Sequence, residues 1–169
     1  EAGITRVVMA MQDPNPLVSG RGRIMLEQAG ITVQTGLLHD EAQGLNYGFV
    51  SRMTRRRPWV RLKIATSLDG RTALNNGTSQ WITGDAARLD GHRWRARSCA
   101  IMTGIGTVKV DDPRLTVRDL DVVRQPEKIV VDSKLDISCD AKILQEGNTV
   151  IFTANPGKCE KRSVLEGRG

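Results

Sequence analysis

The alternation of apolar and polar residues predicts a strand–helix–strand unit at the beginning of the chain. The apolar run over residues 6–11 is typical of a short buried strand. It ends at a proline-rich segment, residues 13–16, which neither a helix nor a central strand accommodates. A short helix is expected over residues 20–29, closed by Gly30, and the alternation over residues 31–35 predicts the next strand. Strands joined through a helix are usually parallel, so we expect a parallel pair.

A second helix is predicted by apolar residues at helical spacing over residues 42–53, with a stripe that faces a core. Asp40 and Gln43 resemble a capping box, which puts Asp40 at the N-cap. The period of the pattern changes across residues 54–58, where three arginines precede a proline. We therefore divide the chain into two parts, residues 1–53 and 54–169.

Apolar and polar positions alternate over residues 59–65 and predict a strand. Lys63 lies in the middle of this strand, which is unusual in so apolar a segment. Most lysines in such a position lie on a solvated sheet face, and the other interpretation is a chemical role. Turns are predicted next by Asp69-Gly70 and by Asn75-Asn76-Gly77.

The longest predicted helix runs from residue 83 or 84 to about residue 97. Arg88, His92 and Arg95 are spaced to form a basic stripe along one of its faces. Such a stripe either binds a phosphate or is a solvated helix face, and the solvated face is the commoner case. Further strands are predicted over residues 99–103, 128–132 and 149–153. The alternation of strands and helices places the chain in the α/β class.

The segment over residues 104–118 combines features of a ligand-binding loop. It follows the apolar run 100–102, which is typical of the end of a buried strand. Gly104 and Gly106 permit a tight turn and a close approach to a ligand. If Thr107 opens a short helix, the free N–H groups at that helix end form a site for phosphate.

Two carboxylates in the same segment are expected to differ in role. Asp112 directly precedes Pro113, which pushes its backbone towards extended geometry, and we expect its side chain to serve the turn. Asp111 lies before that constraint, where its carboxylate is able to reach a ligand seated above the glycines. The alternative for the whole segment is a surface turn with solvated charges.

Composition narrows the choice of partner. The 169 residues carry a net charge of +6, which favours an anionic partner, either nucleic acid or a phosphorylated small molecule. An aromatic content of 4% leaves few stacking platforms for single-stranded nucleic acid. Three scattered cysteines and two distant histidines have no metal-ligand spacing, so we expect no metal site and a reducing, cytoplasmic setting.

The chain is expected to be a piece of a longer protein, because it begins at Glu1 and stops within a pattern at Gly169. No stretch approaches the length of a membrane-spanning helix, so we expect no membrane partner.

Several spaced motifs resemble the reductase domain of the bacterial bifunctional riboflavin-biosynthesis deaminase/reductases. They are Val60–Lys63, Ser67–Arg71, Ser79–Thr83, Gly106-Thr107 and Asp111–Arg118, in that order. Residues 6–49 resemble the end of the deaminase domain of the same family, through Asp13–Pro16, Ala29–Ile31 and related positions. The resemblance covers nearly the whole chain and is weakest after about Leu135.

The resemblance implies an α/β chain in which an incomplete reductase domain, related to dihydrofolate reductase, follows the C-terminal part of a cytidine-deaminase-like domain. It implies NADPH-dependent reduction of 5-amino-6-(5-phosphoribosylamino)uracil to the ribitylamino product in an intact, homo-oligomeric protein. That protein would also carry a zinc-dependent diaminohydroxyphosphoribosylaminopyrimidine deaminase. The zinc signature of that deaminase is not in this sequence, so zinc is expected only outside this chain. The alternatives are a stand-alone reductase of the same superfamily and a basic nucleic-acid-binding module.

Site residues are also implied by the resemblance. Catalytic roles fall to Lys63 and Asp111. The NADP site would be lined by Ala65, Trp81, Thr107, Asp111 and Ser133. The substrate site would be lined by Ser79, Arg95, Leu115 and Arg118. Lys109 stands where we expect an apolar or small residue, which is without consequence only if its side chain faces outward.

Overall fold

The computed structural model describes residues 3–154 and 159–167, and the chain divides into two compact units, Glu1–Leu62 and Lys63–Gly169. The two units are described separately. The domain boundary expected after residue 53 stays a prediction.

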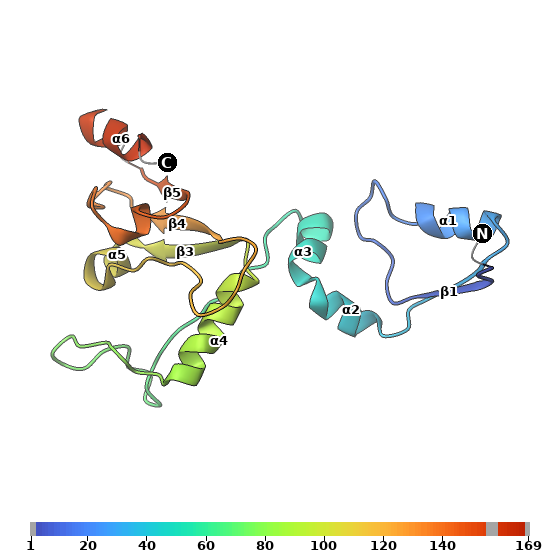
Figure 1. The fold of residues 1–169 in the computed structure, drawn as a ribbon, viewed down its shortest axis with the longest axis horizontal. Helices are drawn as coiled ribbons and strands as arrows, with labels where there is room; N and C mark the ends of the chain where they lie inside the picture. Colours follow the sequence, from blue (N-terminus) through green and yellow to red (C-terminus); the bar gives the residue numbers. More distant parts are fainter. Residues whose placement is uncertain (1–2, 155–158, 168–169) are drawn as a thin grey trace. The chain divides into compact units, whose positions relative to one another are not determined.

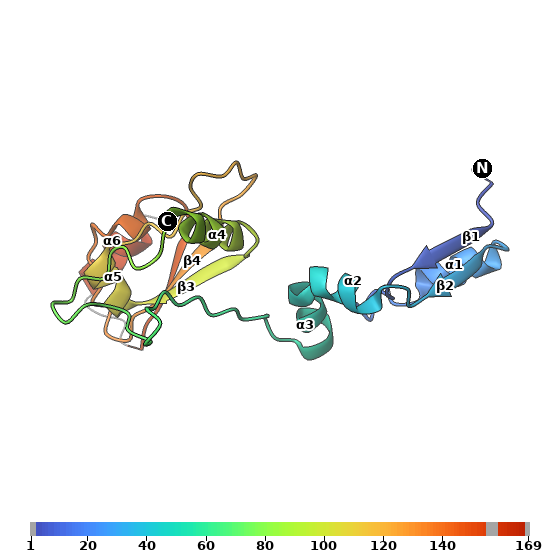
Figure 2. The ribbon, with the colours of Figure 1, turned by 90° about the horizontal axis from the view of Figure 1, so that it is seen from below.

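The first unit begins with the strand–helix–strand arrangement expected from the sequence. Strand β1 (Arg6–Met9) pairs in parallel with β2 (Thr32–Thr35), and α1 (Arg21–Gln28) connects them and lies beside them (Figure 2). Gly30, at φ 77°, takes the left-handed conformation that ends the helix without steric strain. The expected burial of the first strand is wrong, because its residues alternate between exposed and half-buried.

The helix expected over residues 42–53 is two helices, α2 (His39–Leu45) and α3 (Tyr47–Arg55), divided at Asn46. The Asn46 side chain donates to the carbonyl of Ala42, the acceptor that its own backbone N–H would use in a continuous helix. The predicted capping box is also wrong, because Leu38 is the N-cap of α2 and Asp40 lies in its first turn. No core-facing stripe forms, and Leu45 is 76% exposed.

The strand expected over residues 59–65 does not form among the described residues. Trp59 stacks on Tyr47, with ring centroids 5.0 Å apart, but Val60 and Leu62 are both 80% exposed. A strand needs a neighbour for its backbone N–H and C=O groups, and the described part of the chain supplies none here. Alternating sequence was therefore insufficient to produce a strand.

The second unit is built on a parallel sheet in the order β3–β4–β5, and its three strands lie where the sequence predicts strands (Figure 1). The strands are β3 (Ala100–Gly104), β4 (Glu127–Val131) and β5 (Thr149–Phe152). The helical elements are α4 (Asp85–Ala96), α5 (Ile105–Asp111), the short 3-10 helix η1 (Lys142–Leu144) and α6 (Cys159–Glu166). Parallel strands with helical connections give the α/β class.

The core of this unit lies on one face of the sheet. Val130 on β4 is fully buried, and it packs in one cluster with Val108 on α5 and with Ile137 and Ile143 from the connection between β4 and β5. The opposite face carries exposed apolar side chains, and Met102 is 63% exposed. The expectation that residues 100–102 are buried is therefore wrong, because only one face of β3 is covered by described residues.

Lys128 is a buried lysine within this core face, 2% exposed. Its Nζ donates to the carbonyl oxygens of Ile143, within η1, and of Glu146, just after it. Burial lowers the pKa of the Lys128 ammonium, and the charge of Glu146 opposes that shift. The ammonium thus anchors the segment between η1 and β5 to the middle of the sheet.

Candidate functional site

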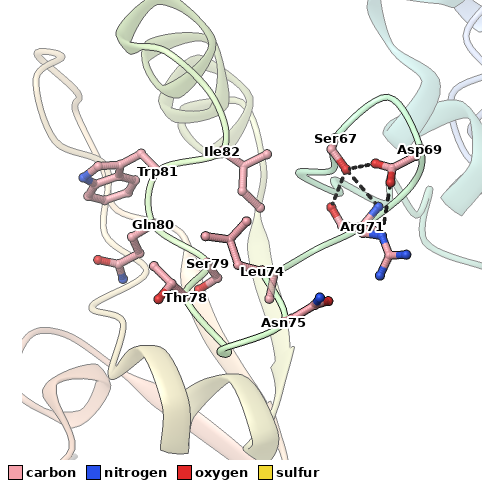
Figure 3. A pocket seen from close by; sticks show the side chains of 11 residues that line it. Ser67, Asp69, Arg71, Leu74, Asn75, Thr78, Ser79, Gln80, Trp81 and Ile82 are labelled. Carbon is pink, nitrogen blue, oxygen red and sulfur yellow. Dashed lines mark hydrogen bonds and ion pairs between the residues drawn. The ribbon is translucent and has the colours of Figure 1, made fainter.

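Residues 67–82, the loop before α4, line an open pocket of about 590 Å³, called the hollow below. At one side, Ser67 Oγ donates to Asp69 Oδ1 at 2.5 Å and Arg71 Nε donates to Asp69 Oδ2 at 3.1 Å. Both hydrogen bonds lower the pKa of Asp69, and the hydrogen bond from Ser67 has the larger effect. Figure 3 shows this group on one side of the hollow and Trp81 on the other, with Ile82 between them. The hollow is therefore polar at one side and bounded by an exposed indole at the other.

Arg88 anchors the end of this loop to α4. Its guanidinium lies 4.7 Å from the centroid of the Trp81 ring, its Nη1 donates to the Thr83 carbonyl at 2.8 Å, and Asp85 forms an ion pair with it. A cation held over an indole face is stabilising. Arg88 is therefore occupied within the protein and does not form part of a free basic stripe.

His92 and Arg95 hold the segment 116–118 along α4. The buried His92 accepts the backbone N–H of Arg118 at Nδ1, over 3.1 Å. Arg95 Nη1 donates to the Thr116 carbonyl over 3.3 Å. The spacing of His92 and Arg95 thus places both side chains against a distant segment. A solvated helix face is therefore the wrong interpretation of these two positions.

Gln125 fastens the same segment from its other side. The Gln125 side chain accepts the Val117 N–H at 2.7 Å and donates to the Val117 carbonyl at 3.1 Å. Leu115, at the start of the segment, is buried with a positive φ of 54°. The path of the backbone from Leu115 to Arg118 is thus determined by α4 on one side and by Gln125 on the other.

Arg95 and Arg118, which we call the arginine pair, form a locally cationic site. Burial, and then the charge of Arg118, lower the pKa of Arg95. Among the residues that the structure describes, neither guanidinium forms an ion pair with a carboxylate. Because the two like charges act on one another and neither is held in an ion pair among the described residues, an anion bound there gains attraction from both. Guanidinium groups bind phosphate through charge-assisted, often bidentate hydrogen bonds.

Helix α5 begins two residues earlier than expected. Gly104 is the N-cap with extended φ and ψ of −91° and 159°, and Ile105 is the first helical residue, so Thr107 does not open the helix. Ile105 packs against the core, which places the helix start there. Lys109 faces outward, where its Nζ lies 2.7 Å from Asp136 Oδ2, so its presence does not disturb α5.

Asp112 departs from its predicted geometry and its carboxylate binds a distant residue rather than the turn, whereas the ligand role of Asp111 stays a prediction. Asp112 has φ 40° and ψ 57°, a left-handed conformation that aspartate tolerates, rather than an extended one. Its Oδ1 accepts the Lys142 N–H at 2.9 Å and its Oδ2 lies 3.1 Å from Lys142 Nζ. The hydrogen bond from the Lys142 backbone lowers the pKa of Asp112 most, and the one from the Lys142 side chain lowers it further. Asp111 is exposed, and the described residues supply no hydrogen bond or ion pair to its carboxylate.

A family model described as the RibD C-terminal domain matches residues 58–166, well over half of the chain. This chain belongs to that family. The riboflavin biosynthesis protein RibD of Bacillus amyloliquefaciens is 47% identical over all of this chain and 46% of its own length. That of Escherichia coli K12 is 48% identical over 89% of this chain and 44% of its own.

Solved structures of the RibD family agree with the fold. Form 1 of Acinetobacter baumannii RibD matches 95% of this chain and 46% of its own with a TM-score of 0.85, at 44% identity. A Thermotoga maritima diaminohydroxyphosphoribosylaminopyrimidine deaminase/5-amino-6-(5-phosphoribosylamino)uracil reductase matches 98% of this chain and 52% of its own, with a TM-score of 0.84 at 33% identity. The expected α/β fold, with a reductase domain related to dihydrofolate reductase, is confirmed. The chain spans about half the length of the relatives it matches.

The residues that the family resemblance assigned to the site fall into separate groups. Ser79 and Trp81 line the same hollow. Arg95 and the backbone of Arg118 meet where α4 contacts the segment 116–118, whereas Leu115 packs in the core cluster. Thr107 and Ser133 are exposed and follow β3 and β4, at the carboxyl edge of the sheet. Lys63 is exposed and Ala65 half-buried on the unpaired segment, and no contact within the described residues joins Lys63 to Asp111.

Three structural contributors were missed by the sequence analysis. His92 was noted only as part of the basic stripe of the predicted helix. Nothing in the sequence indicated the two hydrogen bonds of Gln125 with the Val117 backbone. Asp132 is fully buried at the end of β4, and its Oδ2 accepts the Ile137 N–H at 2.8 Å, which shapes the loop that carries Ser133. A carboxylate directly after the apolar run 129–131 was the available signal for it. In the described part of the chain, no helix is long and apolar enough to cross a membrane.

Proposed function

We propose that the intact protein acts in riboflavin biosynthesis. Residues 1–53 would be the C-terminal part of its deaminase domain, and residues 54–169 would be the first part of its NADPH-dependent reductase. The reaction would reduce 5-amino-6-(5-phosphoribosylamino)uracil to the ribitylamino product. Support comes from the RibD C-terminal family match and from the reductase activity named for the Thermotoga maritima relative. The same family match favours this function over a nucleic-acid-binding module.

The arginine pair is the observation that carries the proposal. The substrate class has a phosphate at one end, and the pair offers two guanidinium groups that have no carboxylate partner among the described residues. Arg95 and Arg118 would bind this phosphate, while Ser79 and Leu115 would contact the remainder of the substrate. An anchored phosphate keeps the reacting ribose carbon in a constant position, which is the chief contribution of a protein to hydride transfer.

The described residues fit a nicotinamide cofactor at the carboxyl edge of the sheet. Open parallel sheets bind ligands at this edge, where Thr107 and Ser133 present hydroxyl groups. Trp81 is 70% exposed and offers a flat apolar surface. NADPH, when bound, supplies the hydride that reduces the ribose carbon. Ala65, Trp81, Thr107, Asp111 and Ser133 are the residues that would hold it.

Lys63 and Asp111 are the proposed catalytic residues. Both charged groups are exposed. The Lys63 ammonium would polarise the reacting ribose carbon or orient its hydroxyl groups, and the Asp111 carboxylate would hold the ribose or carboxamide of the cofactor.

The intact protein would contain the rest of the family's apparatus outside this chain. That apparatus includes a zinc-dependent deaminase, with zinc bound by residues that precede the present sequence. We further propose a cytoplasmic homo-oligomer, in agreement with the family's place in a biosynthetic pathway.

Replacing Arg95 with alanine tests the phosphate assignment. The substrate KM should rise about tenfold or more, because a charge-assisted hydrogen bond contributes roughly 1.5–3 kcal/mol, while cofactor affinity stays near that of the wild type. Steady-state kinetics of the full-length protein measure both constants. Arg93→Ala, an exposed position on the same helix, is the control and should leave the substrate KM unchanged. An unchanged KM in Arg95→Ala would remove Arg95 from the substrate site.

Asp111 and Asp112 should give opposite phenotypes when each is changed to asparagine. Asp111→Asn keeps the shape of an exposed side chain, so folding should survive while the rate of hydride transfer falls by about tenfold or more. Asp112→Asn removes the charge that pairs with Lys142, so the thermal midpoint should fall more than turnover. Thermal unfolding and single-turnover absorbance of the nicotinamide distinguish them. Exchanged phenotypes, or a normal rate in Asp111→Asn, would contradict the assignment.

A further inference from the structure

His92 is a buried histidine whose role the proposed reaction does not use. It lies on α4, three residues before Arg95, and is 9% exposed. Its Nδ1 accepts the backbone N–H of Arg118 at 3.1 Å, across 26 residues of sequence. The ring therefore fixes the backbone from which one member of the arginine pair extends.

The surroundings of the ring determine its protonation state. An Nδ1 that accepts a hydrogen bond carries no proton, so the neutral ring bears its proton on Nε2. Arg95 from α4, with Arg118 and Asp119 from the facing segment, are the charged groups that act on it. Burial lowers the pKa of His92 most, the two arginines lower it further, and only Asp119 raises it. Neutral His92 is thus the form present at neutral pH.

We propose that His92 is a positioning residue for phosphate recognition, whose neutral Nδ1 holds the Arg118 backbone against α4 and so keeps the Arg118 guanidinium beside Arg95. This inference rests on the proposed function of the arginine pair. His92 itself does not contact the substrate. Its contribution is to the affinity for the phosphate group and not to the rate of the hydride step.

Two substitutions at position 92 separate positioning from packing. His92→Phe keeps a ring of similar size and removes the acceptor. His92→Asn removes much of the ring, but its Oδ1 lies about where Nδ1 was and accepts the same N–H. If packing were the role, phenylalanine would be the better replacement. If the hydrogen bond is the role, asparagine is the better one.

The experiment measures KM and kcat of the full-length protein with the phosphorylated substrate, and equilibrium affinity for that substrate and for its dephosphorylated analogue. His92→Phe should weaken affinity for the phosphorylated compound about 3- to 10-fold, the effect of one lost hydrogen bond, with kcat and the affinity for the dephosphorylated analogue unchanged. His92→Asn should stay within about threefold of the wild type, a margin that allows for imperfect geometry of one hydrogen bond. His39→Phe, at the exposed start of α2, is the control.

Dependence on pH provides a readout that survives poor folding of the phenylalanine variant. Protonation of Nδ1 removes the acceptor, so the ratio of wild-type KM to His92→Asn KM should rise as the pH falls through the pKa of His92, which burial holds below the ordinary histidine value of 6.5. The titration of the substrate phosphate affects both proteins and cancels in this ratio. A ratio that stays constant with pH would overturn the proposal.

Arg118→Ala distinguishes failure of this inference from failure of the proposed function. If Arg118→Ala weakens phosphate-dependent affinity and His92→Phe does not, only the role of His92 is overturned. An equal loss of affinity for both compounds in His92→Phe also overturns it, because that result indicates general structural damage. If Arg118→Ala itself leaves affinity unchanged, the phosphate assignment fails and the role of His92 fails with it.

Discussion

Replacing Arg95 and Arg118 together with alanine should raise the KM for the phosphorylated substrate by about 100-fold or more. Each charge-assisted hydrogen bond to a phosphate contributes roughly 1.5–3 kcal/mol, and about 1.4 kcal/mol corresponds to a factor of ten. Because Arg95 is half-buried, solvent screens its charge less than that of the exposed Arg118. Cofactor affinity should change little.

The matched control for this variant removes two positive charges elsewhere in the same unit. Arg93 and Arg124 are both exposed, so Arg93→Ala combined with Arg124→Ala gives the same net charge without touching the arginine pair. Substrate KM and cofactor dissociation constants of both double variants should be measured at two salt concentrations. Equal losses in the two variants would show that overall charge, and not a phosphate site at the arginine pair, governs binding.

Lys128→Ala should lower the free energy of unfolding by about 3 kcal/mol, a large effect for one substitution. The Nζ of Lys128 donates to the carbonyls of Ile143 and Glu146 in a core position that is 2% exposed. An unsatisfied buried acceptor costs roughly 1–3 kcal/mol, and the cavity left by the aliphatic stem adds to that. Thr149 Oγ1 still donates to the Ile143 carbonyl, so the Glu146 carbonyl suffers the greater loss.

Urea denaturation of the full-length protein measures this change. Lys128→Met retains the volume of the stem and removes only the donor, so its loss of unfolding free energy should fall between those of the wild type and the alanine variant. Lys134→Ala, an exposed lysine of the same unit, should be nearly neutral. Equal stabilities of Lys128→Ala and Lys134→Ala would mean that the buried ammonium does not stabilise the segment after η1.

Elements that depend on nearby residues were predictable from the sequence. Gly30 closes α1 and Gly84 is the N-cap of α4, as their local patterns indicate. A helix satisfies its backbone groups internally, and a glycine supplies its unusual conformation wherever it lies. The same locality explains one error, because the Asn46 side chain competes for a carbonyl that apolar spacing does not take into account.

Elements that depend on a distant partner were not predictable. Residues 59–65 have the alternation of a strand, but the described residues give them no neighbour, so no strand forms. Residues 100–102 belong to a strand whose second face no described residue covers, although their apolar character indicated burial. Asp112 adopts a left-handed conformation before proline, and its carboxylate accepts a hydrogen bond from Lys142, thirty residues later.

For the candidate site, the sequence by itself determined the α/β class and, through the order of several spaced motifs, the family. Through the family resemblance, the sequence also indicated Arg95 and Arg118 as candidate substrate-site residues, without relating one to the other. Only the tertiary structure decided that they form one cationic site and that Arg88, on the same predicted stripe, is occupied by Trp81 and Asp85. The physical reason is that the contact of α4 with Thr116–Arg118, made by His92 and Arg95, joins segments more than twenty residues apart. No periodicity within either segment encodes that contact.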